Sequence, residues 1–168
     1  EELARQAKIM EDFGAQIVVA DNAGTVVLQN VRTNGSPSAW HIGAGVVASD
    51  TGRLVIQGCT LEGISTAGFP TSPESGLVAV NTLLAVSDTA LLADGHGAEF
   101  GEPGPAGARL ENCVAHFARV RVIGGVGTAD EFFQGPGGAG IELVDSSLVI
   151  AGGPANLVQG GKGWTSGG

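Results

Sequence analysis

Large and charged side chains are scarce in this sequence of 168 residues. Tyrosine is absent, aromatic residues make up 5% of the chain, and charged residues make up 15%, well below the usual quarter. The chain still has enough apolar side chains to build a core, at 43% hydrophobic residues, which argues against disorder. The 29 glycines follow no three-residue period, which excludes collagen.

Cysteine, long apolar runs and positive charge are also in short supply. Two cysteines cannot frame a disulfide-rich miniature domain, and no run of about 18 apolar residues indicates a membrane-spanning helix. The net charge of −9, from 17 acidic and 8 basic residues, argues against a surface for nucleic acid. We therefore expect a single domain with no nucleic-acid partner and no membrane insertion, processed or cut from a longer chain.

The sequence does contain an internal repeat. Residues 18–35 (VVADNAGTVVLQNVRTNG) align without a gap with residues 46–63 (VVASDTGRLVIQGCTLEG), and seven of the eighteen positions are identical. Looser copies lie at residues 76–91, 108–115 and 140–153. Between the copies the loops vary in length. The alignment gives one equivalent apolar column, which is Leu28, Ile56, Val86, Leu110 and Ile150.

Each unit has the pattern of a short strand, a polar break, a second short strand and a loop. The strands are rich in valine, leucine and isoleucine, and their alternation is typical of β-structure. Asn, Asp and Ser at the breaks tolerate tight and left-handed turns. A glycine precedes the first strand, where the chain must bend, at Gly45, Gly76, Gly97 and Gly140. One unit cannot bury its apolar face alone, so we predict that the copies stack.

Residues 45–63 and their copies resemble the right-handed parallel β-helix of the pectate-lyase-like superfamily. The resemblance rests on apolar columns and corner residues, and it covers residues 15–153. It implies an all-β solenoid of about five to six turns. It also implies a stacked polar ladder along one corner, formed by Asn22, Asp50, Asn81 and Asp145.

The two ends of the chain depart from the repeat. Residues 1–13 are predicted to form a helix, because apolar residues recur on one face and a glycine follows. We interpret this helix as a cap over the open end of the coil rather than as a partner or membrane helix, because uncovered strand edges attract other chains. Residues 154–168 are predicted to be a glycine-rich tail.

The cysteines and histidines are widely spaced. The alignment places Cys59 and Cys113 two turns apart, or roughly 10 Å at about 4.8 Å per turn, which is too far for a disulfide. We therefore expect buried free thiols. His41, His96 and His116 are isolated, so the sequence predicts no metal site and no cofactor. Calcium at the acidic turns is left open as an alternative.

The best candidates for ligand binding are basic and aromatic residues. In a strand, Arg119 and Arg121 would point to one outer face with His116 nearby, which suits an anionic ligand. Trp40 and His41, in a long loop, would add a ring for sugar stacking. No pair of carboxylates has a spacing that demands catalysis, and no nucleophile elbow or phosphate loop is present, so no catalytic residue is assigned.

These observations predict a non-catalytic structural or adhesive β-helix element of an extracellular or cell-surface protein. Its expected partners are polysaccharide or neighbouring β-helix segments. Two alternatives stay open. One is a polysaccharide lyase or hydrolase, or its carbohydrate-binding remnant, with a cleft along one sheet. The other is a subunit that stacks end to end into filaments. The fold alone does not choose among them, because this kind of coil carries many functions.

Overall fold

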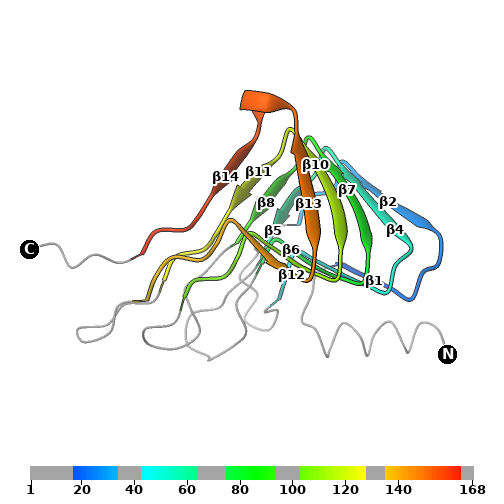
Figure 1. Cartoon of the computed structure of the whole chain (residues 1–168), viewed down its shortest axis with the longest axis horizontal. Coiled ribbons are helices and arrows are strands. Elements are labelled where there is room, and N and C mark those ends of the chain that lie inside the picture. The colour runs from blue at the N-terminus through cyan, green and yellow to red at the C-terminus, as the bar shows by residue number, and fades with distance from the viewer. Residues whose placement is uncertain (1–16, 34–42, 64–74, 94–102, 128–134, 164–168) are drawn as a thin grey trace, which may run out of the picture.

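Three parallel β-sheets wind into a solenoid (Figure 1). The computed structural model describes residues 17–33, 43–63, 75–93, 103–127 and 135–163. The first sheet contains β1 (Ile17–Ala20), β3 (Val46–Ser49), β6 (Leu77–Val80), β9 (Ala108–Glu111) and β12 (Ile141–Val144). The second sheet contains β2 (Thr25–Gln29), β4 (Arg53–Gln57), β7 (Leu83–Ser87), β10 (Val114–Ala118) and β13 (Ser147–Ala151). The third sheet contains β5 (Thr60–Glu62), β8 (Ala90–Leu92), β11 (Arg121–Ile123) and β14 (Leu157–Gln159), and the short 3-10 helix η1 (Gly153–Ala155) precedes β14.

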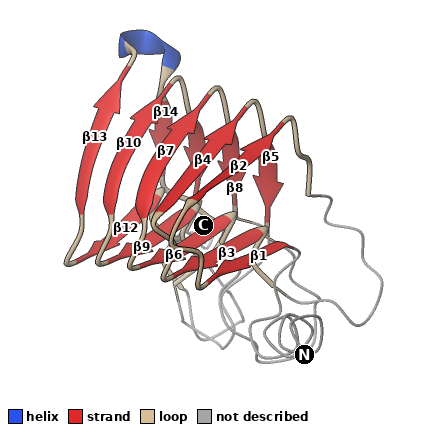
Figure 2. Cartoon of the chain, turned by 90° about the vertical axis from the view of Figure 1, so that its right-hand side faces the viewer, coloured by secondary structure: helices blue, strands red, loops and turns tan. Residues whose placement is uncertain are grey.

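The chain passes through the three sheets in order, and each circuit forms one coil. Coil 1 contains β1 and β2, with a single bridge from Arg32 to Thr60 in place of a third strand. Coils 2 to 5 each contribute one strand to every sheet. In Figure 1 the last coil runs anticlockwise from β12 through β13 to β14. Figure 2 shows that successive coils advance toward the viewer of Figure 1, so the solenoid is right-handed.

The predicted right-handed parallel β-helix is therefore confirmed, with five coils in the described residues. Its core consists of apolar columns, because alternate residues of each strand point inward. In β7, Leu84 and Val86 are buried inside, whereas Leu83 and Ala85 point outward. Phe117 is the largest fully buried side chain. The predicted capping helix, residues 1–13, lies outside the described residues.

Strand pairing corrects the repeat alignment in coil 4. Phe117 of β10 lies in register with Val86 of β7. Phe117, rather than Leu110, therefore belongs to the column of Leu28 and Ile56, and Leu110 belongs to the first sheet. With this correction the steps along the column are 28, 30, 31 and 33 residues. The repeat is thus more regular than the sequence alignment indicated.

Two of the three corners turn through a residue in the left-handed backbone conformation. The first corner joins the first sheet to the second, and the second corner joins the second sheet to the third. Asn and Asp adopt this conformation more readily than most other non-glycine residues. The first-corner column is Asp21, Asp50, Asn81, Asn112 and Asp145, with φ from 46° to 50°. The second-corner column is Asn30, Gly58, Asp88, Arg119 and Gly152.

The predicted corner ladder differs from the first-corner column in two coils. In coil 1, Asp21 rather than Asn22 holds the left-handed position. The side-chain oxygen of Asn22 instead accepts a hydrogen bond from the Gly24 N–H at 2.8 Å. In coil 4, Asn112 joins the column, although the ladder predicted from sequence did not include it. The other predicted ladder residues, Asp50, Asn81 and Asp145, lie in this column.

The residue after each left-handed position usually turns inward and satisfies backbone groups. Thr82 Oγ1 donates to the Val80 carbonyl at 2.8 Å, and Thr89 Oγ1 donates to the Ser87 carbonyl at 2.7 Å. The same bond recurs at Thr51 and Ser146. A left-handed residue followed by a small polar residue that faces the core is therefore typical of the first corner, and it recurs at the second corner in coil 3, at Asp88 and Thr89.

Both cysteines occupy this inward position, but at different corners. Cys59 lies at the second corner of coil 2, and Cys113 lies at the first corner of coil 4. Their predicted placement in one column is therefore wrong, because the alignment matched a second corner with a first corner. Both thiols are free and buried, as expected. Each donates to the carbonyl two residues earlier, and burial raises the pKa of Cys113.

The third corner, which leads from the third sheet back to the first, is built on glycine for reasons of space. A Cβ atom on Gly76 would lie 2.6 Å from the Leu61 carbonyl oxygen and 2.6 Å from the Leu92 nitrogen. Coil 4 uses Gly107 at this position, so the predicted choice of Gly97 is wrong. The complete column is Gly45, Gly76, Gly107 and Gly140.

Glycine-rich segments beside coils 4 and 5 also pack backbone against backbone. Gly125 donates its N–H to the Pro105 carbonyl at 2.7 Å, and Gly138 donates to the Gly125 carbonyl at 2.8 Å. Gly161 then donates to the Gly138 carbonyl at 2.7 Å. The coils therefore continue through β14, beyond the predicted boundary at residue 153, and part of the predicted tail is ordered against them.

Candidate functional site

The structure places the predicted ligand-binding residues on different parts of the surface. His116 lies in β10 and points outward from the second sheet, whereas Arg121 begins β11 and points outward from the third. Arg119 lies between them at the second corner. The corner separates the two faces, so the three side chains do not form one cluster on one sheet. Trp40 and His41 lie outside the described residues.

Arg119 is bonded to an acidic residue of the preceding coil. Its Nε and Nη2 atoms donate to Oδ1 and Oδ2 of Asp88, each at 2.6 Å. Both residues hold left-handed positions of the second corner. The hydrogen bond from Arg119 lowers the pKa of Asp88, and the Asp88 carboxylate raises the pKa of Arg119. This exposed ion pair links coils 3 and 4. It also means that the Arg119 guanidinium, which was predicted from the sequence to bind an anionic ligand, already bonds to a carboxylate of the protein.

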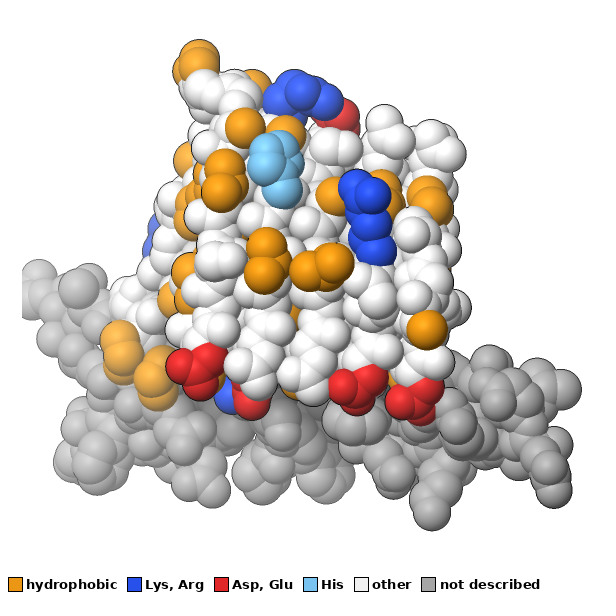
Figure 3. Space-filling model, turned by 45° about the vertical axis from the view of Figure 1, so that its right-hand side comes forward, with side chains coloured by type: hydrophobic (Ala, Val, Ile, Leu, Met, Phe, Trp, Pro, Cys, Tyr) orange, Lys and Arg blue, Asp and Glu red, His pale blue; other side chains and the backbone are white. Residues whose placement is uncertain are grey.

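The outer face of the second sheet is mostly uncharged. Within its five described strands, only Arg53 and His116 carry ionisable side chains on this face. Figure 3 shows hydrophobic side chains spread over this side of the molecule and acidic side chains along its lower edge. The apolar side chains that are more than half exposed here are Val27, Leu83, Val114 and Val149.

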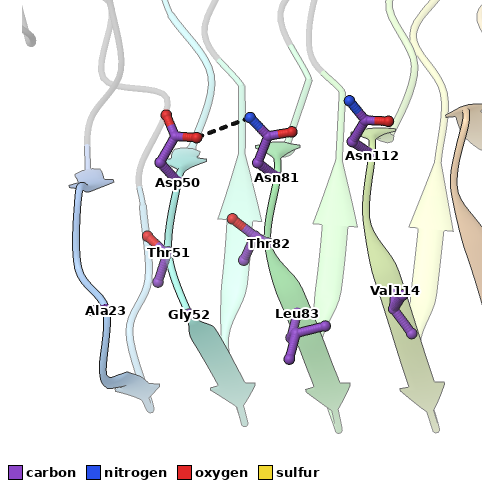
Figure 4. A pocket seen from close by; sticks show the side chains of 9 residues that line it. All are labelled: Ala23, Asp50, Thr51, Gly52, Asn81, Thr82, Leu83, Asn112 and Val114. Atoms are coloured by element: carbon purple, nitrogen blue, oxygen red, sulfur yellow. Dashed lines mark hydrogen bonds between the residues drawn. The ribbon is translucent and has the colours of Figure 1, made fainter.

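A shallow groove of about 600 Å³ follows the first corner across neighbouring coils (Figure 4). Its polar side is formed by Asp50, Asn81 and Asn112, which come from coils 2, 3 and 4. Leu83 and Val114, at the start of β7 and β10, give it an apolar side. Asn81 Nδ2 donates to Asp50 Oδ1 at 2.8 Å, and Figure 4 shows the three polar side chains side by side.

This groove can bind through hydrogen bonds and apolar contact together. The two amides offer both donors and acceptors, and the Asp50 carboxylate accepts. The aliphatic side chains of Leu83 and Val114 offer a strip against which carbon–hydrogen groups can pack. The combination suits an extended, hydroxyl-rich chain that lies along the solenoid axis.

Asn112 was not predicted from the sequence, because the repeat alignment placed coil 4 in the wrong register. A signal was nevertheless present. The glycine of the third corner stands five residues before the left-handed residue of the first corner in four successive coils. The pairs are Gly45 with Asp50, Gly76 with Asn81, Gly107 with Asn112, and Gly140 with Asp145.

The carboxylates do not form an evident catalytic pair in the described part of the chain. Asp50 lies at the first corner and Asp88 at the second, so the length of the second sheet separates them. On the outer face of the first sheet, Glu142 lies in register with Arg109 and diagonally to Glu111. A basic residue therefore sits directly beside one of these two acids, and the pair resembles a mixed-charge surface patch.

The described residues contain no group of three or more His, Cys, Asp or Glu side chains that could hold a metal ion. The described residues also include no helix with the length and hydrophobicity needed to cross a bilayer. The chain matches no family model, no curated protein and no solved structure.

Proposed function

We propose that this chain is a non-catalytic structural element, a β-solenoid of the pectate-lyase-like type, in an extracellular or cell-surface protein. The observation that supports this proposal most directly is the use of the corner side chains. Asp50 bonds to Asn81, and Asp88 bonds to Arg119, in each case between adjacent coils. Polar groups that an enzyme would direct at a substrate are here bonded to one another across adjacent coils.

A coupling measurement tests whether these groups act structurally. Arg119→Ala and Asp88→Ala should each lower the thermal midpoint, and the double variant should lower it by less than the sum of the two, because both remove one interaction. The same proteins should be incubated with acidic and with neutral polysaccharides, with and without calcium. Cleavage products that disappear in Arg121→Ala, with no change in its thermal midpoint, would replace this proposal with the enzyme alternative.

Carbohydrate binding is the second candidate, and the groove at the first corner favours it. The supporting observation is the adjacency of Asp50, Asn81 and Asn112 to the exposed side chains of Leu83 and Val114. Neutral oligosaccharides fit this site better than polyanions do, because the groove carries a carboxylate and the chain carries a net charge of −9.

Two groove variants and one matched control test this second candidate. Asn112→Gly removes the amide and keeps a residue that adopts positive φ, and Leu83→Ser removes the apolar side chain. Val27→Ser is the control, because Val27 is similarly exposed on the same sheet but lies outside the groove. On a glycan array, both groove variants should lose binding several-fold while the control keeps it. Equal binding by all three proteins would exclude the groove.

A further inference from the structure

The C-terminal end of the solenoid exposes the interior of the core. Leu143, Ile150 and Val158 are 45%, 44% and 43% exposed, one from each of the three sheets. Their register partners in coil 4 are Leu110, Phe117 and Val122, and each of these is 0% exposed. The three exposed residues therefore belong to core columns and are uncovered because no strand of the described chain stacks on coil 5.

Among the described residues, no strand pairs with the outer strand edges at this end. β12, β13 and β14, of four, five and three residues, are each the last strand of their sheet. An edge strand presents unpaired N–H and C=O groups and is a template for pairing with another chain. In Figure 1, η1 stands above the upper corner of the solenoid, beside this end rather than across it.

The N-terminal end differs. Val19, in the first-sheet core column, is 9% exposed, and Leu28, in the second-sheet column, is partly buried. A head-to-tail contact would place the three exposed residues of the C-terminal end against an end where Val19 is buried and Leu28 is partly buried. In a contact between two C-terminal ends, both surfaces carry the exposed core-column residues Leu143, Ile150 and Val158.

The geometry points to a two-fold symmetric dimer in which the C-terminal ends of two copies of this chain meet. A two-fold axis perpendicular to the solenoid axis and through the middle of β13 would place β13 antiparallel to the β13 strand of the other copy. It would place β12 over β14 of the other copy, and antiparallel edges of this kind form regular ladders. In this arrangement β13 pairs with a strand of equal length, five residues, and β12 pairs with a strand one residue shorter, at four against three residues.

This arrangement closes the assembly. An isologous interface uses the same patch on both copies, so no further copy can add, whereas a head-to-tail interface continues into a filament. The core columns of the two copies would become continuous through Leu143, Ile150 and Val158. The inference is independent of the proposed function, because a structural rod and a carbohydrate-binding solenoid can both dimerise in this way.

Sedimentation velocity and light scattering across a concentration series test the dimer, with two matched pairs of variants. Ile150→Lys should be monomeric, and Val149→Lys, which changes the neighbouring outward residue of the same strand, should remain dimeric. Val158→Lys and Leu157→Lys form the second pair on β14. Circular dichroism must show that each variant is folded. A wild-type monomer at every concentration, or equal behaviour within both pairs, would overturn the inference.

Spin-label distances test the orientation of the copies. Val27 and Val149 lie in one outward column, in coils 1 and 5, and the native cysteines are buried, so Val27→Cys and Val149→Cys can each be labelled selectively. In the proposed dimer the Val149→Cys labels should be close. The Val27→Cys labels should be farther apart by about 38 Å, which is eight strand spacings. Equal distances at both positions would indicate a head-to-tail filament, and a closer Val27→Cys pair would indicate contact of the N-terminal ends. Either result refutes the inference.

Discussion

The first and third corners of each coil make similar bends with different residues. At the first corner the chain turns through Asp or Asn at positive φ, as at Asn112 with φ 50°. At the third corner it turns through glycine, as at Gly76, where the backbone of two neighbouring segments leaves no room for a Cβ atom. At the first corner, a local dihedral angle selects the residue type. At the third corner, the residue type is selected by the close approach of backbone segments that are distant in sequence.

This difference predicts how each corner responds to substitution. A residue chosen for its dihedral angle can be exchanged for another that adopts the same angle. A residue chosen for space can be exchanged for nothing larger, because the atoms that it would meet are backbone and cannot move aside. Substitutions at the two corners should therefore separate the two causes.

Gly76→Ala should have the largest effect. The new methyl group would overlap two backbone atoms, and overpacking of this kind costs about 1–3 kcal/mol of unfolding free energy. The control is Gly24→Ala, where the nearest atom, 3.2 Å away, belongs to the Asn22 side chain. Urea unfolding should show a clear loss for Gly76→Ala and a small one for Gly24→Ala. Equal losses of stability in the two variants would mean that the lack of room for a Cβ atom is not the reason for glycine at the third corner.

Asn112→Ala should have the next largest effect. Left-handed backbone costs an ordinary L-residue about 1–2 kcal/mol, and Asn112 holds φ 50°. Asn112→Gly should be close to neutral, because glycine adopts positive φ freely. Urea midpoints of the two variants measure the difference. If alanine and glycine proved equally destabilising, the side-chain amide rather than the dihedral angle would account for the preference.

Thr82→Val tests the inward residue of the same corner and should have a smaller effect. The substitution keeps the shape but removes the hydrogen bond from Oγ1 to the Val80 carbonyl, which is worth about 0.5–1.5 kcal/mol. Thermal unfolding would measure the loss. Thr60→Val on β5 is a suitable control, because Thr60 is a partly exposed strand residue. A larger loss at Thr60 would contradict the structural role assigned to this corner position.

The Asp88–Arg119 pair at the second corner should have the smallest effect, and it should depend on pH. The folded-state pKa of Asp88 lies below its unfolded value, so the pair stabilises the fold above the unfolded pKa. That stabilisation is lost as the pH falls through the lowered folded pKa. The thermal midpoints of wild type and Asp88→Asn should therefore differ at neutral pH and converge in acid. Added salt should also reduce the difference, because both side chains are exposed.

The sequence was sufficient to predict the coil, but the predicted register was one residue off in the first sheet of coil 1 and wrong in coil 4. The match of residues 18–35 with 46–63 has the true register in the second sheet, where Thr25 pairs with Arg53, but it is one residue off in the first sheet, where Val18 pairs with Val47. The match of residues 108–115 with 54–61 was misleading, because a first corner with Asn112 and Cys113 looks like a second corner with Gly58 and Cys59. Both corners place a left-handed residue before a small buried one, so a short local pattern cannot tell them apart.

The candidate site was harder to predict than the fold. Asp50 and Asn81 were identified as corner residues, but their adjacency to Leu83 and Val114 depends on how three coils align. Arg119 and Arg121 were grouped because they are close in sequence. The second corner falls at Arg119 and places the two residues at different parts of the surface.

The sequence by itself determined the elements of this protein. Alternating apolar residues specify the strands, and Asp and Asn specify the bends at the first corner, because both are local preferences of the chain. The tertiary structure decided which equivalent residues are covered. Phe117 and Ile150 share one column, yet one is 0% and the other 44% exposed. Burial in a solenoid comes from the next coil, about thirty residues away, and no local pattern records whether that coil is present.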